Sequence, residues 1–295
     1  MKNILIIGAN GFTGRRILND LSVNPIYHVT GCSLRDDICP GKDYRFVRTD
    51  IRDENEVRKL FKECRPDIVI NTSALSVPDY CETHHAEAEA TNVTAVETIA
   101  HVCEQYGSRF IHLSTDFVFD GKSTRLYKEE DEAIPVNYYG VTKLKAEKII
   151  ASICSNYAIV RVVVVYGKAL PGQHGNILQL VANRLRNGET IRVVSDQWRT
   201  PTFVGDISVG VEKLMFHTAN GIYHICGSEC LTIAEIAYRV ADFLKLDRSL
   251  IEPVTTEEMK ETTPRPRFSG LSIEKAIREL AYAPHTLEEG LGELK

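Results

Sequence analysis

The sequence predicts an α/β fold built on a doubly wound parallel sheet, with a smaller α/β lobe supplied by the second half of the chain. Short apolar runs alternate with helix-length segments through residues 2–166. The connections between successive runs are long enough for the helical crossovers that parallel strands require. A glycine-rich turn follows the first run, and ligands of such sheets bind at the carboxyl ends of the strands.

The first expected strand, residues 2–8, leads directly into a turn with glycines at three-residue spacing. This spacing permits a tight turn and brings a phosphate close to the N-terminus of the next helix, residues 15–21. A strand, a glycine turn and a helix in succession therefore indicate dinucleotide binding. The residues of this turn that we expect to contact the cofactor are Gly8, Asn10, Gly11, Phe12, Thr13 and Gly14.

The second expected strand, residues 27–33, ends without the carboxylate that holds the adenosine ribose in NAD enzymes. Ser33 and Arg35 occupy this region instead. Because a guanidinium suits a ribose 2′-phosphate, the sequence favours NADP(H) over NAD(H). Asp36 and Asp37 follow directly, and a solvated loop charge is the alternative interpretation of Arg35.

Two further strands, residues 44–49 and 67–71, flank a helix over residues 54–64. The carboxylate that follows the first of them could meet the adenine edge, and small residues follow the second. Both strand ends lie where ligands bind in open α/β sheets. From these ends, and from the expected helix over residues 86–106, we predict cofactor contacts by Asp50, Ile51, Ser73, Ala74, Leu75 and Asn92.

The fifth strand, residues 109–113, is followed by Ser114 and Thr115. A hydroxyl at this strand end could hydrogen-bond a substrate carbonyl and polarise it as negative charge develops. The alternative is that both residues only cap the strand, which is a common role of serine and threonine.

Tyr139 and Lys143 are four residues apart at the start of an expected helix over residues 140–154. Residues at this spacing share a helix face, so a lysine ammonium would lie near the phenol and lower its pKa toward values useful for proton transfer. Tyr138 has Thr142 at the same offset, so only Tyr139 is paired with a cation. The alternative is that the four-residue spacing of Tyr139 and Lys143 arose by chance. The glycine turn and the Ser114–Thr115 pair upstream favour a role in proton transfer.

The alternation weakens after a strand over residues 159–166. We expect the cofactor domain to comprise residues 1–165 with 190–220, and a substrate-binding lobe to comprise 166–189 with 221–295, with a ligand crevice between them. The remaining expected elements are strands 190–194 and 221–226 and helices 175–187, 206–217, 233–244, 273–280 and 287–291.

Composition narrows the classes of partner. The formal charge is −5, and without a basic run nucleic acid is not expected as a partner. No apolar run has the length of a signal peptide or a membrane span, and the eight cysteines form no CxxC pair. The adjacent His84 and His85 would diverge by about 100° on a helix, so no metal site is expected. We predict a cytoplasmic protein with no membrane partner.

With the glycine turn, the Ser114–Thr115 pair and the Tyr139/Lys143 pair in this order, the chain resembles the extended short-chain dehydrogenase/reductase family. This resemblance implies a Rossmann domain that holds NAD(P) and a lobe that holds a nucleotide-activated sugar. It further implies that Tyr139 donates a proton, that Lys143 holds the nicotinamide ribose, and that Thr115 binds the carbonyl oxygen.

Within that family the chain is most similar to the dTDP-4-dehydrorhamnose reductases, through residues 71–82, 114–121, 196–202 and 231–237. The resemblance implies hydride transfer from NADPH to a sugar ketone. Arg199 could bind a diphosphate, although an exposed arginine covering Trp198 is the alternative. The substrate-binding residues expected on this basis are Ser76, Phe117, Val164, Asn176, Arg199 and Arg265.

Two positions depart from that pattern, which has tyrosine at Phe117 and tryptophan at Val164. The specific sugar is therefore left open, and the absence of an acid at Phe117 disfavours the related dehydratases. The chain is also similar to the regulatory β subunit of methionine adenosyltransferase, so an NADP-binding interaction protein is the alternative from another class. A nucleotide-sugar epimerase and a homodimer are further possibilities.

Overall fold

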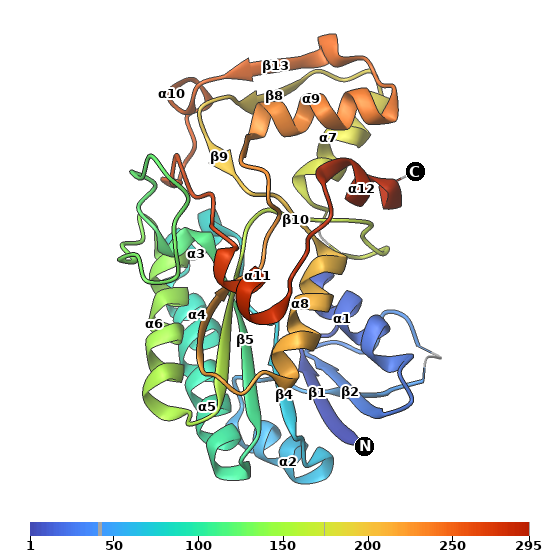
Figure 1. The fold of residues 1–295 in the computed structure, drawn as a ribbon, viewed down its shortest axis with the longest axis vertical. Helices are drawn as coiled ribbons and strands as arrows, with labels where there is room; N and C mark the ends of the chain where they lie inside the picture. The colour runs from blue at the N-terminus through green and yellow to red at the C-terminus, as the bar shows by residue number, and fades with distance from the viewer. Residues whose placement is uncertain (41–42, 174, 295) are drawn as a thin grey trace.

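The structure, a computed structural model, describes residues 1–40, 43–173 and 175–294. At its centre is a seven-stranded sheet in the order β11-β6-β5-β4-β1-β2-β3, and each neighbouring pair is parallel (Figure 1). The predicted doubly wound fold is therefore confirmed. The strands of this sheet are β1 (Lys2–Ile7), β2 (Tyr27–Ser33), β3 (Arg45–Arg48), β4 (Ile68–Asn71), β5 (Arg109–Thr115), β6 (Tyr157–Val162) and β11 (Gly221–His224).

Helices cover both faces of the sheet because successive apolar side chains of each strand point in opposite directions. In β1, Ile4 and Ile6 belong to the core beneath α1 and α8, whereas Leu5 and Ile7 belong to the core beneath α2, α5 and α6. These helices are α1 (Phe12–Ser22), α8 (Val204–Phe216), α2 (Glu54–Cys64), α5 (Ala95–Tyr106) and α6 (Tyr138–Ile153).

A smaller layer lies beyond the carboxyl ends of the central strands, at the top of Figure 1. Its β8 (Ile191–Val194) pairs in parallel with β13 (Ile251–Val254), and α9 (Ile233–Leu244) packs on both strands. The helix α7 (Ile177–Arg186) packs against α9, and the apolar side chains of these elements form a third core.

Two strands pair differently from the expected division of the chain. The strand expected over 190–194 joins β13 in the smaller layer, and the strand expected over 221–226 extends the central sheet beside β6. Backbone hydrogen bonding decides this assignment, and sequence position alone does not reveal it. The division into two domains stays a prediction, with these two strands exchanged between its parts.

The helix expected over 86–106 is divided. It consists of α4 (His85–Glu89), a π-helical turn (Ala90–Thr94) and α5, after the short α3 (Pro78–Thr83). A π turn inside a helix is frequent at functional sites, and this one carries Asn92.

The strand expected over 159–166 is also interrupted. It consists of β6 and β7 (Val165–Tyr166), and Val164 between them has φ of 37°. Such a value is an outlier for a β-branched residue, so the surrounding structure must hold this bend.

Several short elements complete the fold. No helix among the described residues has the length and apolar character to cross a membrane. The short elements are β9 (Trp198–Arg199), β10 (Thr202–Phe203), β12 (Leu231–Thr232), α10 (Thr256–Met259), α11 (Glu274–Leu280) and α12 (Leu287–Leu291).

Candidate functional site

The glycine turn between β1 and α1 leaves no room for side chains. Gly8 has φ of 83°, and a Cβ atom on Gly14 would lie 2.3 Å from the Gly8 carbonyl oxygen. Gly11 is the N-cap of α1 and brings no side chain to the first N–H groups of that helix. Open N–H groups at a helix start favour an anion, so the turn fits a dinucleotide diphosphate.

A loop from the second half of the chain is hydrogen-bonded to this turn. The Gln173 side-chain amide donates to the carbonyl oxygens of Asn10 (3.0 Å) and Gly11 (3.1 Å). Gln173 was not among the predicted site residues, because a single glutamine about 160 residues downstream belongs to no motif.

The loop after β2 is held by a buried ion pair. Arg15, which is 2% exposed, lies 2.5 Å from the Asp37 carboxylate, and the Tyr44 hydroxyl donates to the same carboxylate at 2.7 Å. Although burial raises the pKa of Asp37, bonds from the Cys39 amide, Tyr44 and Arg15 lower it overall. The side chain of Asp37 is therefore engaged by protein groups, whereas Arg35 is exposed beside the turn.

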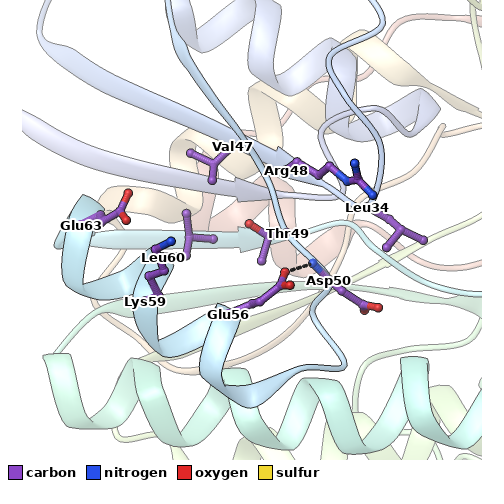
Figure 2. Close-up of a pocket in the computed structure, with 9 residues that line it drawn as sticks. All are labelled: Leu34, Val47, Arg48, Thr49, Asp50, Glu56, Lys59, Leu60 and Glu63. Atoms are coloured by element: carbon purple, nitrogen blue, oxygen red, sulfur yellow. Dashed lines mark hydrogen bonds between the residues drawn. The ribbon is translucent and has the colours of Figure 1, made fainter.

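A cavity of about 530 Å³ lies between the ends of β2 and β3 and α2 (Figure 2). The Asp50 amide there donates to Glu56 (2.7 Å), and the Asp50 carboxylate pairs with Arg52 (2.6 Å). This hydrogen bond from Arg52 lowers the pKa of Asp50. Contacts of Asp50 and of the partly buried Ile51 with an adenine ring stay a prediction.

Asn92 ties the loop after β4 to α6. Its side chain accepts from the Leu75 amide (2.8 Å) and donates to the Leu75 carbonyl and the Thr142 hydroxyl, both at 3.0 Å. The same loop passes the glycine turn, because a Cβ atom on Gly8 would lie 2.8 Å from the Ser73 amide. The structure thus brings Ser73 to the glycine turn, while the fully buried Asn92 holds Leu75 two residues further along the same loop.

Tyr139 lies in the first turn of α6, as the sequence predicts. Asn137 caps this helix by accepting from the Gly140 amide at 2.9 Å. The Thr115 hydroxyl lies near the Tyr139 phenol, and it donates to the Asp116 carboxylate at 3.1 Å. The Phe117 ring meets the Tyr139 ring edge-on, with centroids 5.9 Å apart. The predicted hydroxyl pair of Thr115 and Tyr139 is therefore assembled at the carboxyl end of β5.

The predicted lowering of the tyrosine pKa is wrong for the structure as it stands. Burial raises the pKa of Tyr139, and Asp116 and Cys81 raise it further, while the Thr115 hydrogen bond lowers it. Lys143 instead lies 2.9 Å from His112 Nε2 and donates to the Leu113 carbonyl at 2.7 Å. Burial lowers the pKa of Lys143 to about 8, although Glu147 opposes this shift.

Arg199, predicted either to bind a diphosphate or to lie exposed over Trp198, is buried in the structure. It is 2% exposed, so the alternative of an exposed arginine is wrong. Its guanidinium lies 3.7 Å from Asp116, donates to Gln197 (3.1 Å) and stacks over Phe117. Burial raises the pKa of Asp116, whose carboxylate also accepts hydrogen bonds from Ser269 and Thr115. Arg199 therefore packs against the Phe117 ring with its polar groups bound to other protein residues. Diphosphate binding by Arg199 stays a prediction.

The other residues predicted to bind the substrate, which are Asn176, Arg265, Ser76 and Val164, lie in different parts of the structure. Asn176 caps α7 and donates to the Gly167 carbonyl at 3.0 Å, so its side chain serves the local fold. Arg265 lies between Asp79 (3.7 Å) and Glu261 (3.3 Å). Ser76 is exposed on the loop after β4, and Val164 is the strained bend after β6.

The adjacent histidines do not point to a metal. His84 stacks on Tyr80 and His85 on Tyr138, with ring centroids 3.8 and 3.7 Å apart. Within the described ranges, no three His, Cys, Asp or Glu side chains are grouped to hold a metal ion.

A parallel sheet with a glycine turn after β1, a hydroxyl at the end of β5 and a Tyr/Lys pair at the start of α6 defines an extended short-chain dehydrogenase/reductase. Residues 1–294 match the model of the RmlD substrate binding domain, and the chain belongs to this family.

Three relatives illustrate the range of similar proteins. The spore coat polysaccharide biosynthesis protein SpsK of Bacillus subtilis is 32% identical over 295 residues, which cover 99% of this chain and 96% of that protein. Methionine adenosyltransferase 2 subunit beta of Xenopus laevis is 32% identical over 270 residues, which cover 90% and 78%. A dTDP-4-dehydrorhamnose reductase of Bacillus anthracis, solved in complex with NADP, has a TM-score of 0.86 at 27% identity, over 99% of this chain and 98% of that chain.

Proposed function

We propose that this protein is an NADP(H)-dependent reductase of a nucleotide-activated keto-deoxy sugar. The observation that carries the proposal is the neighbouring pair of hydroxyls of Thr115 and Tyr139 at the end of β5, on the same edge of the sheet as the glycine turn. A proton donor beside a dinucleotide site is what carbonyl reduction requires. The similar reductase of Bacillus anthracis, solved with NADP, supports this proposal.

The bound cofactor would supply the hydride. Residues of the glycine turn would hold its diphosphate through backbone N–H groups, and Arg35 would pair with a ribose 2′-phosphate. Asp37, the nearby carboxylate that would repel that phosphate, is already paired with Arg15. This arrangement supports a preference for NADP(H).

Thr115 and Tyr139 would act on the substrate carbonyl. The Thr115 hydroxyl would orient its oxygen by a hydrogen bond, and the Tyr139 phenol would give that oxygen its proton as the negative charge develops. A raised pKa keeps the phenol protonated at neutral pH, which suits a proton donor. Lys143 would contact the nicotinamide ribose from the same helix face.

Phe117 and Val164 would shape the sugar pocket. Phe117 contacts the Tyr139 ring, and Val164 bends the chain where β6 leaves the sheet. The Arg265 side chain is 34% exposed, and its guanidinium lies 3.3 Å from Glu261 and 3.7 Å from Asp79. Arg265 is therefore the stronger of the two arginine candidates for the diphosphate of the substrate, because Arg199 is enclosed by protein groups.

The direct test is oxidation of NADPH by a panel of nucleotide-linked 4-keto-6-deoxy sugars, followed by absorbance. We expect oxidation with at least one member, and faster turnover with NADPH than with NADH. No oxidation with any member, in protein that binds NADPH, would contradict the proposal.

A second candidate is an NADP-binding regulatory protein. The similarity to methionine adenosyltransferase 2 subunit beta, at 32% identity over 90% of this chain, favours it, but it covers less of the chain than the similarity to the reductase solved with NADP. The test is co-purification with a methionine adenosyltransferase catalytic subunit. Complex formation without NADPH oxidation would support this candidate over the reductase.

A further inference from the structure

Asn71, His112 and Lys143 form a buried chain of hydrogen bonds behind the site. Asn71 and His112 are register partners on β4 and β5, and both are fully buried. Asn71 Nδ2 lies 3.1 Å from His112 Nδ1, and His112 Nε2 lies 2.9 Å from Lys143 Nζ, which is 2% exposed. Each atom in this chain must be either a donor or an acceptor, so the protonation states can be worked out.

The orientation of the Asn71 amide is fixed from outside the chain. The Ser73 backbone amide lies 3.1 Å from Asn71 Oδ1, and the Ser73 hydroxyl lies 2.7 Å from the same atom. A backbone N–H only donates, so the atom that faces it is the amide oxygen. The Asn71 NH₂ group therefore faces His112, and His112 Nδ1 must accept.

This acceptor role determines the tautomer of His112. A neutral imidazole with an unprotonated Nδ1 carries its hydrogen on Nε2, and this N–H points at Lys143 Nζ. An ammonium has three donors and no acceptor, whereas a neutral amine has a lone pair. The arrangement is therefore satisfied only when Lys143 is a neutral amine that accepts from His112 and donates to the Leu113 carbonyl.

We propose that Asn71 and His112 are positioning residues that hold Lys143 as a neutral amine in the cofactor-free protein at mildly alkaline pH. The catalytic meaning of this inference rests on the proposed function, since Lys143 would have to gain a proton before its charge could stabilise a phenolate at Tyr139. The inference goes beyond the predicted Tyr139/Lys143 pair, because it makes the charge of Lys143 depend on two residues of the sheet.

The charged and titratable groups around Lys143 agree with this assignment. On α6 these groups are Tyr139 and Glu147, and Glu147 is engaged by Arg161 of β6 at 2.6 Å. On β5 the group is His112, whose pKa is lowered well below its usual value by burial and by Lys143. Cys81 of α3, which lies near Tyr139, is a buried thiol whose pKa is raised by burial, so it brings no charge at neutral pH.

The test is the protonation state of His112 and Lys143 in cofactor-free protein, by NMR at pH 8.5. We expect two-bond ¹H–¹⁵N correlations of an Nε2–H tautomer, assigned to His112 by their loss in His112→Gln. The lysine Cε signal that disappears in Lys143→Met should titrate with a midpoint near or below pH 8. An Nδ1–H tautomer, an imidazolium, or a fully charged Lys143 at pH 8.5 would overturn the proposal.

Asn71→Asp supplies the matched perturbation. An aspartate accepts from His112 Nδ1–H, so the tautomer should switch and the Lys143 midpoint should rise by about one pH unit or more. Asn92→Asp is the control, because it places the same charge on another buried asparagine that contacts Thr142 and not His112. If Asn71→Asp does not fold, the wild-type tautomer alone decides.

None of these measurements uses a substrate. Absence of NADPH oxidation would contradict the proposed function and leave this assignment standing. Conversely, an active reductase with an Nδ1–H tautomer at His112 would contradict the assignment alone.

Discussion

The backbones at Gly140 and Phe117 are in direct contact, so that a Cβ atom on Gly140 would lie 2.1 Å from the Phe117 carbonyl oxygen. Gly140 follows Tyr139 in the first turn of α6, and Phe117 lies two residues beyond Thr115. This contact sets the distance between the helix that carries the phenol and the strand end that carries its hydroxyl partner.

Gly140→Ala should therefore separate the two groups. Since the clash is with backbone, relief requires movement of α6, and we expect a loss of about 1–3 kcal/mol in the free energy of unfolding. Turnover should fall more than tenfold because the Tyr139 phenol moves away from Thr115. Urea denaturation and steady-state kinetics measure the two effects. Gly292→Ala is the control, because nothing lies within 4 Å of its added Cβ. Equal stability of both variants would contradict the contact.

Removal of one partner from the buried Glu147–Arg161 pair should be strongly destabilising. Both side chains are at most 3% exposed, and Arg161 donates to Glu147 at 3.0 and 2.6 Å. Glu147→Ala leaves an uncompensated buried guanidinium, so we expect a loss of about 3–5 kcal/mol in the free energy of unfolding, measured by chemical denaturation.

Two controls accompany this variant. The double variant Glu147→Leu/Arg161→Met should recover most of the loss, because it buries no unpaired charge. Glu54→Ala breaks an exposed pair with Arg58 and should cost less than about 1 kcal/mol. A Glu147→Ala variant as stable as Glu54→Ala would refute the claim that the buried pair matters to folding.

The pKa of Lys143 predicts a dependence of stability on pH. Burial lowers this pKa from 10.5 to about 8, so between these values the unfolded chain binds more protons than the folded protein. Stability contributed by this site should then rise with pH across that window, by an amount on the order of 3 kcal/mol. Below pH 8 Lys143 is protonated in both the folded and the unfolded state, so the cost of burying its charge no longer changes with pH.

Lys143→Met isolates this effect. The difference in free energy of unfolding between the wild-type protein and Lys143→Met should change with pH only between about 8 and 10.5, in favour of the wild type at the alkaline end. Denaturation curves at pH 7, 9 and 10.5 measure it. A difference that does not change with pH would mean that Lys143 titrates alike in the folded and unfolded states.

Arg35→Ala tests the cofactor preference. Arg35 is exposed beside the glycine turn, and loss of one charged contact with a 2′-phosphate should weaken NADPH binding roughly tenfold while leaving NADH unchanged. Calorimetric titration measures both affinities. Arg45→Ala is the matched control. Arg45 begins β3, away from the strand ends where the cofactor would bind, and it forms an exposed ion pair with Glu63. Unchanged NADPH affinity in Arg35→Ala would remove the basis for the NADP(H) preference.

Much of the central sheet could be predicted from the sequence, because buried parallel strands are continuous apolar runs. The order of the strands was not predicted, because the sequence alone does not show which strands pair. The helix α6 was also predicted, over residues 140–154 where the structure has Tyr138–Ile153, with Tyr139 and Lys143 near its start. The two-residue strands β9 and β12 were not, since nothing in so short a segment distinguishes a strand from a loop. The π turn around Asn92 has no sequence signature either.

The site residues that belong to short sequence motifs were predicted. Contacts between residues far apart in the sequence were not. Thr115 and Tyr139 come together as expected from their places at a strand end and a helix start. The cluster of Asp116 with Arg199 and Ser269 joins residues up to 153 positions apart. No local pattern reports that Arg199 is buried, so the sequence left it as an exposed candidate ligand.

The proposed reduction depends on donation of the proton by the Tyr139 phenol. The most direct test compares Tyr139→Phe with Tyr138→Phe, whose lost hydroxyl contacts Glu89 at 3.1 Å outside the proposed chemistry. We expect kcat of Tyr139→Phe to fall by about 10²- to 10⁴-fold with its NADPH affinity preserved, and Tyr138→Phe to resemble the wild type. Turnover of Tyr139→Phe within a fewfold of the wild-type rate would contradict proton donation by the Tyr139 phenol.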